Sequence, residues 1–293
     1  MSYANPDALV TTEWLERRLG DPRIRILEVA ADPAAYDQGH LPGATLWSGL
    51  CDLQRPEPPS CPDQAELSRV LSRAGVDDRS TVVVYGGPGN WLGAFGYWLL
   101  KYRGFDDVHL LDGGREKWRL EARPLTREIA SPQATGFRVT GADRQELRAS
   151  RDHVLAADGD TVLVDTRSPQ EYRGEQLAPP NASQRQNYAG GHIPGARNVP
   201  WPRTTNVDRS FRSLNELRSL FERESVPRDA RVVTYSLSGA RSAHTWFVLK
   251  ELLGYPRVMH YERSWVDYAT TGAPVERGRR RGDPVSASDL EGC

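Results

Sequence analysis

The chain repeats itself at a spacing of about 150 residues, and this repeat constrains the fold more than any other feature. The motif GHLPGA at 39–44 recurs as GHIPGA at 191–196, so the two prolines are 152 positions apart. The run VVVY at 82–85 recurs as VVTY at 232–235, a spacing of 150. Solenoid repeats run to only about 20–50 residues. A spacing this long therefore predicts a duplicated domain.

Short strand-like runs alternate with helical segments in the second copy. Residues 161–165 and 231–235 are rich in β-branched side chains, and 258–261 is a further short apolar run, as is typical of buried strands. The segment 242–253 has the apolar pattern of a buried helix, which Gly254 is expected to end. This alternation predicts an α/β fold in which parallel sheets are flanked by helices.

Ligands in such folds bind beyond the carboxyl ends of the strands, where loops lead into helices. That rule directs attention to residues 86–91 in the first copy and to 236–241 in the second. The first of these loops contains no nucleophile and no arginine. The second is the candidate site.

The composition excludes several classes of function. The 38 Lys+Arg and 39 Asp+Glu residues leave a net charge of −1, so neither nucleic acid nor a membrane surface is an expected partner. No apolar stretch approaches the roughly 20 residues of a membrane span, and no secretory signal is recognisable. Three cysteines suit a reducing compartment, so a cytoplasmic location is expected. Without CxxC or HExxH motifs, neither a metal nor a cofactor is expected.

The loop after the VVTY run has the composition of an anion-binding turn. Backbone N–H groups at a helix N-terminus attract anions, and Gly239 permits a left-handed turn. Arg241 supplies a planar cation, although a surface salt bridge is its alternative role. Ser238 is a candidate hydroxyl donor or a helix cap. We predict an anion site with Ser236 first and Arg241 last, lined by Leu237, Ser238, Gly239 and Ala240.

Several of these features together resemble a tandem rhodanese over about residues 8–276. They are the two GHxPGA motifs, Asp165-Thr-Arg167 followed by Glu171-Tyr172, and an arginine five residues after the first loop position. Bacterial two-domain thiosulfate/3-mercaptopyruvate sulfurtransferases are the most similar group. The resemblance implies a catalytically silent N-terminal domain (1–125) and a C-terminal domain with the active-site loop (143–276). The segment between them, 126–142, has Pro, Ser, Thr and Gly without helical periodicity and is predicted as a linker, and 277–293 has little apolar content and is predicted as a disordered tail.

The family also implies an activity and roles for individual residues. It moves sulfane sulfur from thiosulfate or 3-mercaptopyruvate to a thiol or cyanide acceptor, with a thioredoxin-like protein as one candidate acceptor, through a persulfide on the first loop residue. Asp165, Arg167 and Glu171 match a buried structural support beneath the loop. Arg185 is a candidate for binding the substrate's acidic group, with a solvated loop charge as its alternative.

The histidines of the two GHxPGA motifs, His40 and His192, stand at repeated positions. The family binds no metal there, so hydrogen bonding within the turn is the expected role of both side chains.

Ser236 stands where the family has a cysteine. The chemistry needs a thiolate, and a thiol has a reference pKa of about 8.5, whereas a serine hydroxyl neither ionises near neutral pH nor forms a persulfide. The chain as written is therefore expected to lack persulfide turnover.

Three explanations remain open for Ser236. They are an engineered replacement of cysteine, natural divergence into a non-catalytic module that binds sulfur anions or a protein partner, and serine acting as the nucleophile. The third requires an adjacent base, and His244 lies eight residues further on. The neutral middle of the loop, with its one terminal arginine, does not select a donor.

Overall fold

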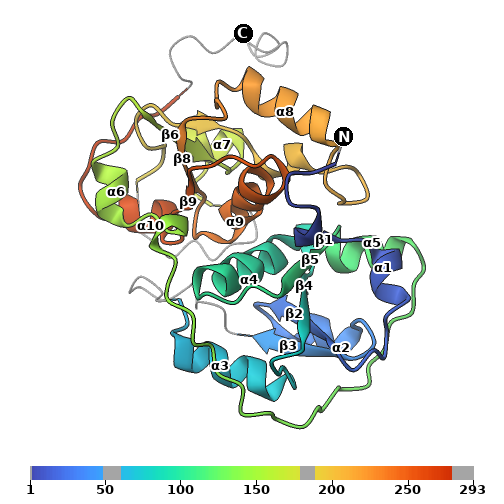
Figure 1. Ribbon diagram of the computed structural model, residues 1–293. Helices are drawn as coiled ribbons and strands as arrows, with labels where there is room; N and C mark the ends of the chain where they lie inside the picture. The colour runs from blue at the N-terminus through green and yellow to red at the C-terminus, as the bar shows by residue number, and fades with distance from the viewer. Residues whose placement is uncertain (1, 49–60, 179–188, 279–293) are drawn as a thin grey trace.

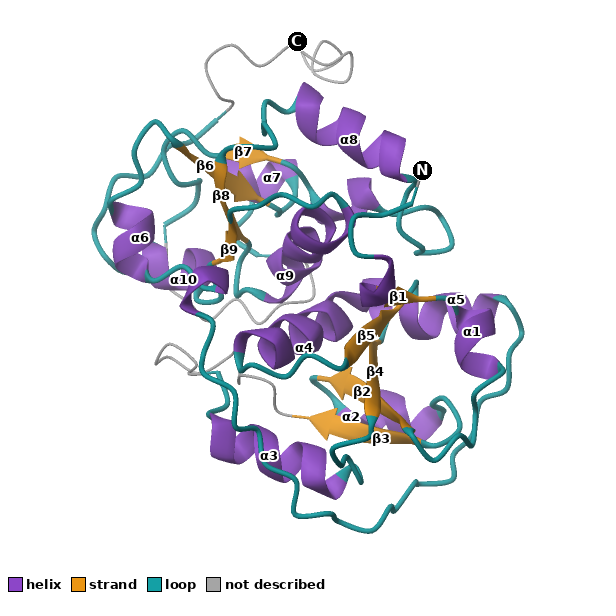
Figure 2. Ribbon diagram, in the orientation of Figure 1, coloured by secondary structure: helices purple, strands orange, loops and turns teal. Residues whose placement is uncertain are grey.

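The computed structural model describes residues 2–48, 61–178 and 189–278, which form two β-sheets flanked by helices (Figures 1 and 2). The strand order is β1-β5-β4-β2-β3 in the first sheet and β7-β6-β8-β9 in the second. Every pairing between these strands is parallel. The predicted architecture of tandem α/β domains is confirmed.

The strands of the described chain are β1 (Leu9–Val10), β2 (Ile24–Ala30), β3 (Ala44–Ser48), β4 (Thr81–Gly86), β5 (Val108–Leu111), β6 (Thr161–Asp165), β7 (Arg197–Asn198), β8 (Arg231–Tyr235) and β9 (Val258–His260). The α-helices are α1 (Thr12–Glu16), α2 (Pro33–Gln38), α3 (Gln64–Arg73), α4 (Trp91–Tyr102), α5 (Gly114–Leu120), α6 (Arg151–Leu155), α7 (Pro169–Arg173), α8 (Leu214–Arg223), α9 (Ala240–Phe247) and α10 (Ser264–Tyr268). Short 3₁₀ turns lie at Pro6–Ala8, Pro88–Asn90, Gln145–Leu147 and Trp201–Thr204.

The three strand-like runs of the second copy form β6, β8 and β9, as predicted. The helix predicted over 242–253 begins two residues earlier, at Ala240, and changes to a π-helix over Val248–Leu252. Gly254 ends it with a φ of +69°, in the left-handed region that glycine adopts readily.

One hydrophobic cluster spans both halves, where α4 packs against α9 (Figure 1), and each half has a further cluster of its own. Tyr97 of α4 meets Phe247 of α9 edge to face, with ring centroids 4.9 Å apart. Trp98 and Trp246, one from each half, belong to the same buried cluster. Helix α4 is apolar on nearly all sides because it faces its own sheet and the other domain together.

The segment predicted as a linker, 126–142, runs along the first half. Its Thr126 pairs with the backbone of His40, and Val139 donates its N–H to the Ser68 hydroxyl at 3.0 Å. The predicted tail lies outside the described residues from 279 onward. Among the described helices, none has the length and apolar character needed to cross a membrane.

Truncating the core shared by the halves should destabilise both together. Phe247→Ala removes a buried ring and is expected to cost about 3–5 kcal/mol. Urea unfolding followed by tryptophan fluorescence and by circular dichroism should shift as one transition. Leu120→Ala, at a side chain that is 60% exposed, should change stability by less than about 0.5 kcal/mol. Separate transitions, with only one displaced, would show that the halves fold independently.

Candidate active site

The loop that follows β8 is shorter than predicted. Residues 236–239 form the loop, whereas Ala240 and Arg241 already belong to the first turn of α9. Gly239 has a φ of +90°, and a Cβ atom at this position would lie 2.2 Å from the carbonyl oxygen of Glu262. Only glycine therefore fits where the chain enters the helix.

Hydrogen-bond donors converge on the side chain of Ser236, which is only 1% exposed. The Gly239 N–H donates to Oγ of Ser236 at 3.1 Å, and the Ser242 hydroxyl, which also donates to the carbonyl oxygen of Gly239 at 2.8 Å, lies 3.4 Å from the same atom. The side chain also lies at the N-terminal end of α9, where the helix dipole is positive. The surroundings of this atom therefore favour a negative charge.

The backbone of the loop is held by the start of α10. Ser236 donates its N–H to Oγ of Ser264 at 3.0 Å, and its carbonyl oxygen accepts the N–H of Trp265 at 3.0 Å. The carbonyl oxygen of Leu237 likewise accepts the N–H of Val266. Ser264 is fully buried and has a φ of +54°, which is strained for a residue other than glycine. This strain accompanies the hydrogen bond that positions Ser236.

His260, at the end of β9, contacts the loop and the start of α9 through its imidazole. Its Nε2 lies 2.9 Å from the carbonyl oxygen of Gly239 and 3.0 Å from Oγ of Ser242. A carbonyl only accepts hydrogen bonds, so Nε2 carries the proton. Burial lowers the pKa of His260 to about 3. Trp98 of the first half contacts the imidazole ring edge to face, with the ring centroids 4.5 Å apart. The first half thus contacts the support of the loop directly.

Sequence reasoning missed His260, Ser242 and Ser264. One signal for His260 was available, since a histidine inside the apolar run 258–261 lies on a strand beside β8. The carboxyl ends of neighbouring parallel strands lie at the same edge of the sheet.

Arg241, predicted as the cation of the anion site, is paired with a carboxylate in the structure, and its anion-binding role stays a prediction. Its guanidinium makes a bidentate ion pair with Glu171, with N···O distances of 2.8 and 2.9 Å. Glu171 is 2% exposed and also accepts the N–H of Ser168 in a capping box at the start of α7. Burial opposes ionisation of this carboxyl, but Arg241, the Ser168 N–H and the charge of Arg167 together outweigh burial and hold the pKa of Glu171 below its usual value. The prediction grouped Glu171 with Arg167, whereas both oxygens of Glu171 bind Arg241.

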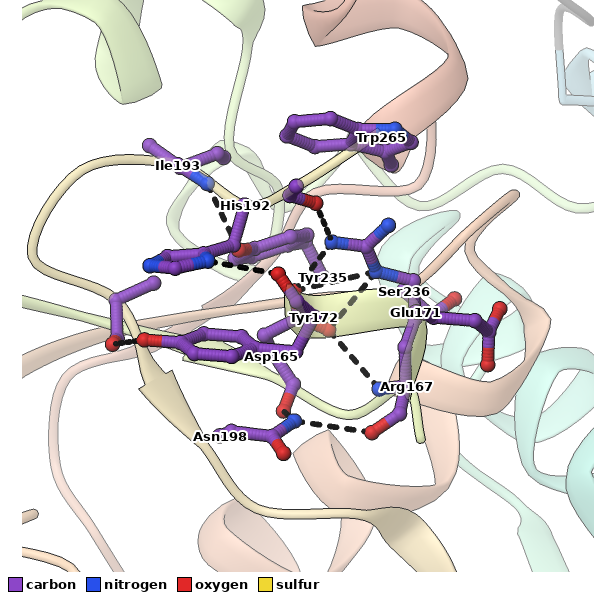
Figure 3. Close-up of polar contacts among 12 residues, drawn as sticks. Asp165, Arg167, Glu171, Tyr172, His192, Ile193, Asn198, Tyr235, Ser236 and Trp265 are labelled. Carbon is purple, nitrogen blue, oxygen red and sulfur yellow. Dashed lines mark hydrogen bonds and ion pairs between the residues drawn. The ribbon is translucent and has the colours of Figure 1, made fainter. Parts of the chain in front are cut away.

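Asp165 and Arg167 form a buried ion pair behind the loop (Figure 3). Arg167 Nη2 lies 2.6 Å from Asp165 and donates to the carbonyl oxygen of Gly191 at 2.7 Å. Its guanidinium also lies over the ring of Trp265, 4.5 Å from the centroid. These contacts join the end of β6, the GHIPGA turn and the start of α10.

The histidines of the two GHxPGA turns share two contacts. His40 stacks on Tyr36 and His192 on Tyr172, with centroids 3.6 and 3.5 Å apart. In each pair, Nδ1 of the histidine bonds the carbonyl oxygen of the tyrosine. No cluster of metal-ligating side chains occurs in the described part of the chain.

The remaining predicted binding residues differ in position. Leu237 and Ser238 are half-buried in the loop, and Ala240 is buried in α9. Arg185 lies outside the described residues. The binding roles of these four residues stay predictions.

Substitutions at Ser264 test how the loop is held. Ser264→Ala and Ser264→Gly both leave the buried N–H of Ser236 unpaired, at a cost of about 1–3 kcal/mol. Glycine also relieves the positive φ, which costs an L-residue about 1–2 kcal/mol. The glycine variant should therefore be about 1 kcal/mol more stable than the alanine variant in urea unfolding. A glycine variant that is equally or less stable would contradict the strain.

The buried His260 predicts a pH-dependent mutational effect. Between about pH 6.5 and 3 the unfolded chain takes up a proton that the folded imidazole does not, so this residue lowers stability as pH falls. His260→Gln removes this loss. Its cost in unfolding free energy should be about 2 kcal/mol smaller at pH 5 than at pH 8. A cost that is equal at both pH values would show that His260 protonates in the folded state.

Comparison with known proteins gives a consistent assignment. A family model described as "Rhodanese-like domain" matches residues 11–121 and 152–271. "Sulfur carrier protein TtuD" of Thermus thermophilus is 42% identical over 284 residues, which cover 95% of this chain and 99% of that protein. "Putative thiosulfate sulfurtransferase" of Mycolicibacterium smegmatis is 44% identical over 276 residues, covering 94% and 99%.

Solved structures with the same fold include two that cover nearly all of this chain. A structure of EanB with a cysteine persulfide and ergothioneine has a TM-score of 0.81 at 22% identity, covering 95% of this chain and 72% of that one. YnjE has a TM-score of 0.80 at 22% identity, covering 96% and 70%. At these identities the likeness concerns the fold alone. The two family matches and the relatives at 42% and 44% identity show that this chain belongs to the rhodanese-like family, with its two copies in tandem.

Proposed function

We propose that the chain is built as a sulfurtransferase in which residue 236 is the position that carries sulfane sulfur. The names of its relatives, a sulfur carrier protein and thiosulfate sulfurtransferases, support sulfur transfer. The donor is thiosulfate or 3-mercaptopyruvate, and the acceptor is cyanide or a cytoplasmic thiol such as that of a thioredoxin-like protein. The first half is a silent copy, and Ser236 blocks the persulfide step in the chain as it stands.

The observation that carries the proposal is the convergence of donors on the side chain of residue 236. With a cysteine there, the Gly239 N–H, the Ser242 hydroxyl and the N-terminus of α9 would stabilise a thiolate. That thiolate would attack the outer sulfur of thiosulfate, forming an S–S bond as sulfite leaves with the electron pair of the broken S–S bond. Cyanide would then remove the outer sulfur as thiocyanate and restore the thiolate.

Serine acting as its own nucleophile finds no support in the described residues. His260 is the histidine connected to Ser236, through Ser242, but its Nε2 carries a proton that points to the Gly239 carbonyl. A pKa of about 3 makes it a weak base. His244 is buried elsewhere, with Nδ1 3.5 Å from Oγ1 of Thr204.

A non-catalytic module that binds sulfur anions through Arg241 is also less well supported. Glu171 already neutralises that guanidinium. Such a module would require sulfite or thiosulfate binding that is lost in Arg241→Ala.

Placing a thiol at the first loop position should create activity. Ser236→Cys is expected to transfer sulfur from thiosulfate or 3-mercaptopyruvate to cyanide, measured as thiocyanate formation, whereas the chain as written should give no rate above background. Gains of several orders of magnitude are expected, because the serine hydroxyl offers no alternative route.

Ser238→Cys is the matched control, since it places the same thiol two residues further along the same loop. Ser238 is half-buried and is not the side chain on which Gly239 and Ser242 converge. Its thiol should give little or no turnover. A well-folded Ser236→Cys protein without turnover from either donor would overturn the proposed function.

A further inference from the structure

The charge of the loop is cancelled by a residue outside it. Residues 236–239 of the loop carry no charge, and the nearest cation in the sequence is Arg241, in the first turn of α9. Glu171 binds both terminal nitrogens of that guanidinium and is almost fully buried. Because its pKa is lowered, Glu171 is ionised at neutral pH, and the pair has no net charge.

Neighbouring arginines on the elements around the loop are paired as well. Arg167 forms an ion pair with Asp165, and Arg148 forms one with Glu262. The backbone carbonyl oxygen of Glu262 lies against Gly239. Within the described chain, the groups that face residue 236 at closest range are therefore neutral donors and a helix N-terminus. A helix N-terminus is equivalent to only about half a positive charge.

The two candidate donors differ in charge. Thiosulfate carries two negative charges, whereas 3-mercaptopyruvate carries one carboxylate. Electrostatic attraction scales with the ligand's charge, so a dianion gains more from an unpaired cation and loses more when that cation is neutralised.

We infer that Glu171 determines donor specificity: by neutralising Arg241 it makes the site favour singly charged donors of the 3-mercaptopyruvate type over thiosulfate. This inference rests on the proposed sulfur-transfer function of the same loop. It assigns Glu171, which lies outside the loop, an electrostatic role in addition to its cap on α7.

Glu171→Gln isolates this role, because glutamine serves at the same position of a capping box and removes only the charge. In the Ser236→Cys background it should raise the ratio of kcat/KM for thiosulfate to that for 3-mercaptopyruvate by about tenfold. In Glu171→Gln this ratio should also fall more steeply with added salt than in the parent with Glu171. The reason is that salt screens the exposed part of the unpaired Arg241 charge. A residue that only supported the fold would lower both rates and leave the ratio and its salt dependence unchanged.

Two variants serve as controls. Glu216→Gln makes the same change in the same kind of capping box, on α8 with Ser213, and should leave the ratio unchanged. Glu171→Asp keeps the negative charge and should keep the preference for 3-mercaptopyruvate. If Glu171→Gln does not fold, Arg241→Gln tests the same pair from the other side, since it leaves Glu171 unneutralised and should lower the ratio.

Calorimetric binding of thiosulfate to the chain as written, with and without Glu171→Gln, separates this inference from the proposed function. Tighter binding in Glu171→Gln supports the inference even if Ser236→Cys is inactive. An unchanged donor ratio in an active Ser236→Cys background, or unchanged thiosulfate affinity in the chain as written, would overturn it.

Discussion

The buried ion pair between Arg167 and Asp165 is the interaction on which the geometry of the site depends. Arg167 extends from the end of β6 to the carbonyl oxygen of Gly191 and over the ring of Trp265. The backbone N–H of Trp265 in turn holds the carbonyl oxygen of Ser236. Removing one partner of such a pair typically costs about 3–5 kcal/mol, because a buried charge is left uncompensated. The ion pair therefore supports the loop indirectly, through Trp265.

In the first half, a side chain occupies the space at the corresponding loop. Asn90 accepts the N–H of Gly86 and donates to the carbonyl oxygen of Leu111, both at 2.7 Å. A Cβ atom at Gly114 would lie 2.6 Å from Asn90. Ser264 has nearly the same φ as Gly114, 54° against 55°, but adds a hydroxyl that binds the backbone of the active loop. The same succession of strand, loop and helix therefore gives two different loops. In the first half the Asn90 side chain occupies the loop, and in the second half hydrogen-bond donors point at the side chain of residue 236.

The fold could be predicted because its signals are local or periodic. The repeat and the β-branched runs at 161–165 and 231–235 identified the strands, and the strand-end rule located the loop. The partner of Arg241 could not be predicted, since Glu171 is 70 positions away and their contact depends on how α7 and α9 pack. One local signal was available: Ser168 precedes Glu171 by three residues, the spacing of a capping box, which places that glutamate at a helix start.

We propose that, among the residues that the structure describes, the side chain of residue 236 and no other is prepared to carry sulfur. Intact-protein mass spectrometry after incubation with a sulfane-sulfur donor tests it most directly. Ser236→Cys should gain the mass of one sulfur atom, located at residue 236 by peptide mapping and removed by cyanide, whereas the chain as written should gain none at this position. A Ser236→Cys protein that gains no sulfur at residue 236, or that gains it at Cys61 instead, would contradict the account.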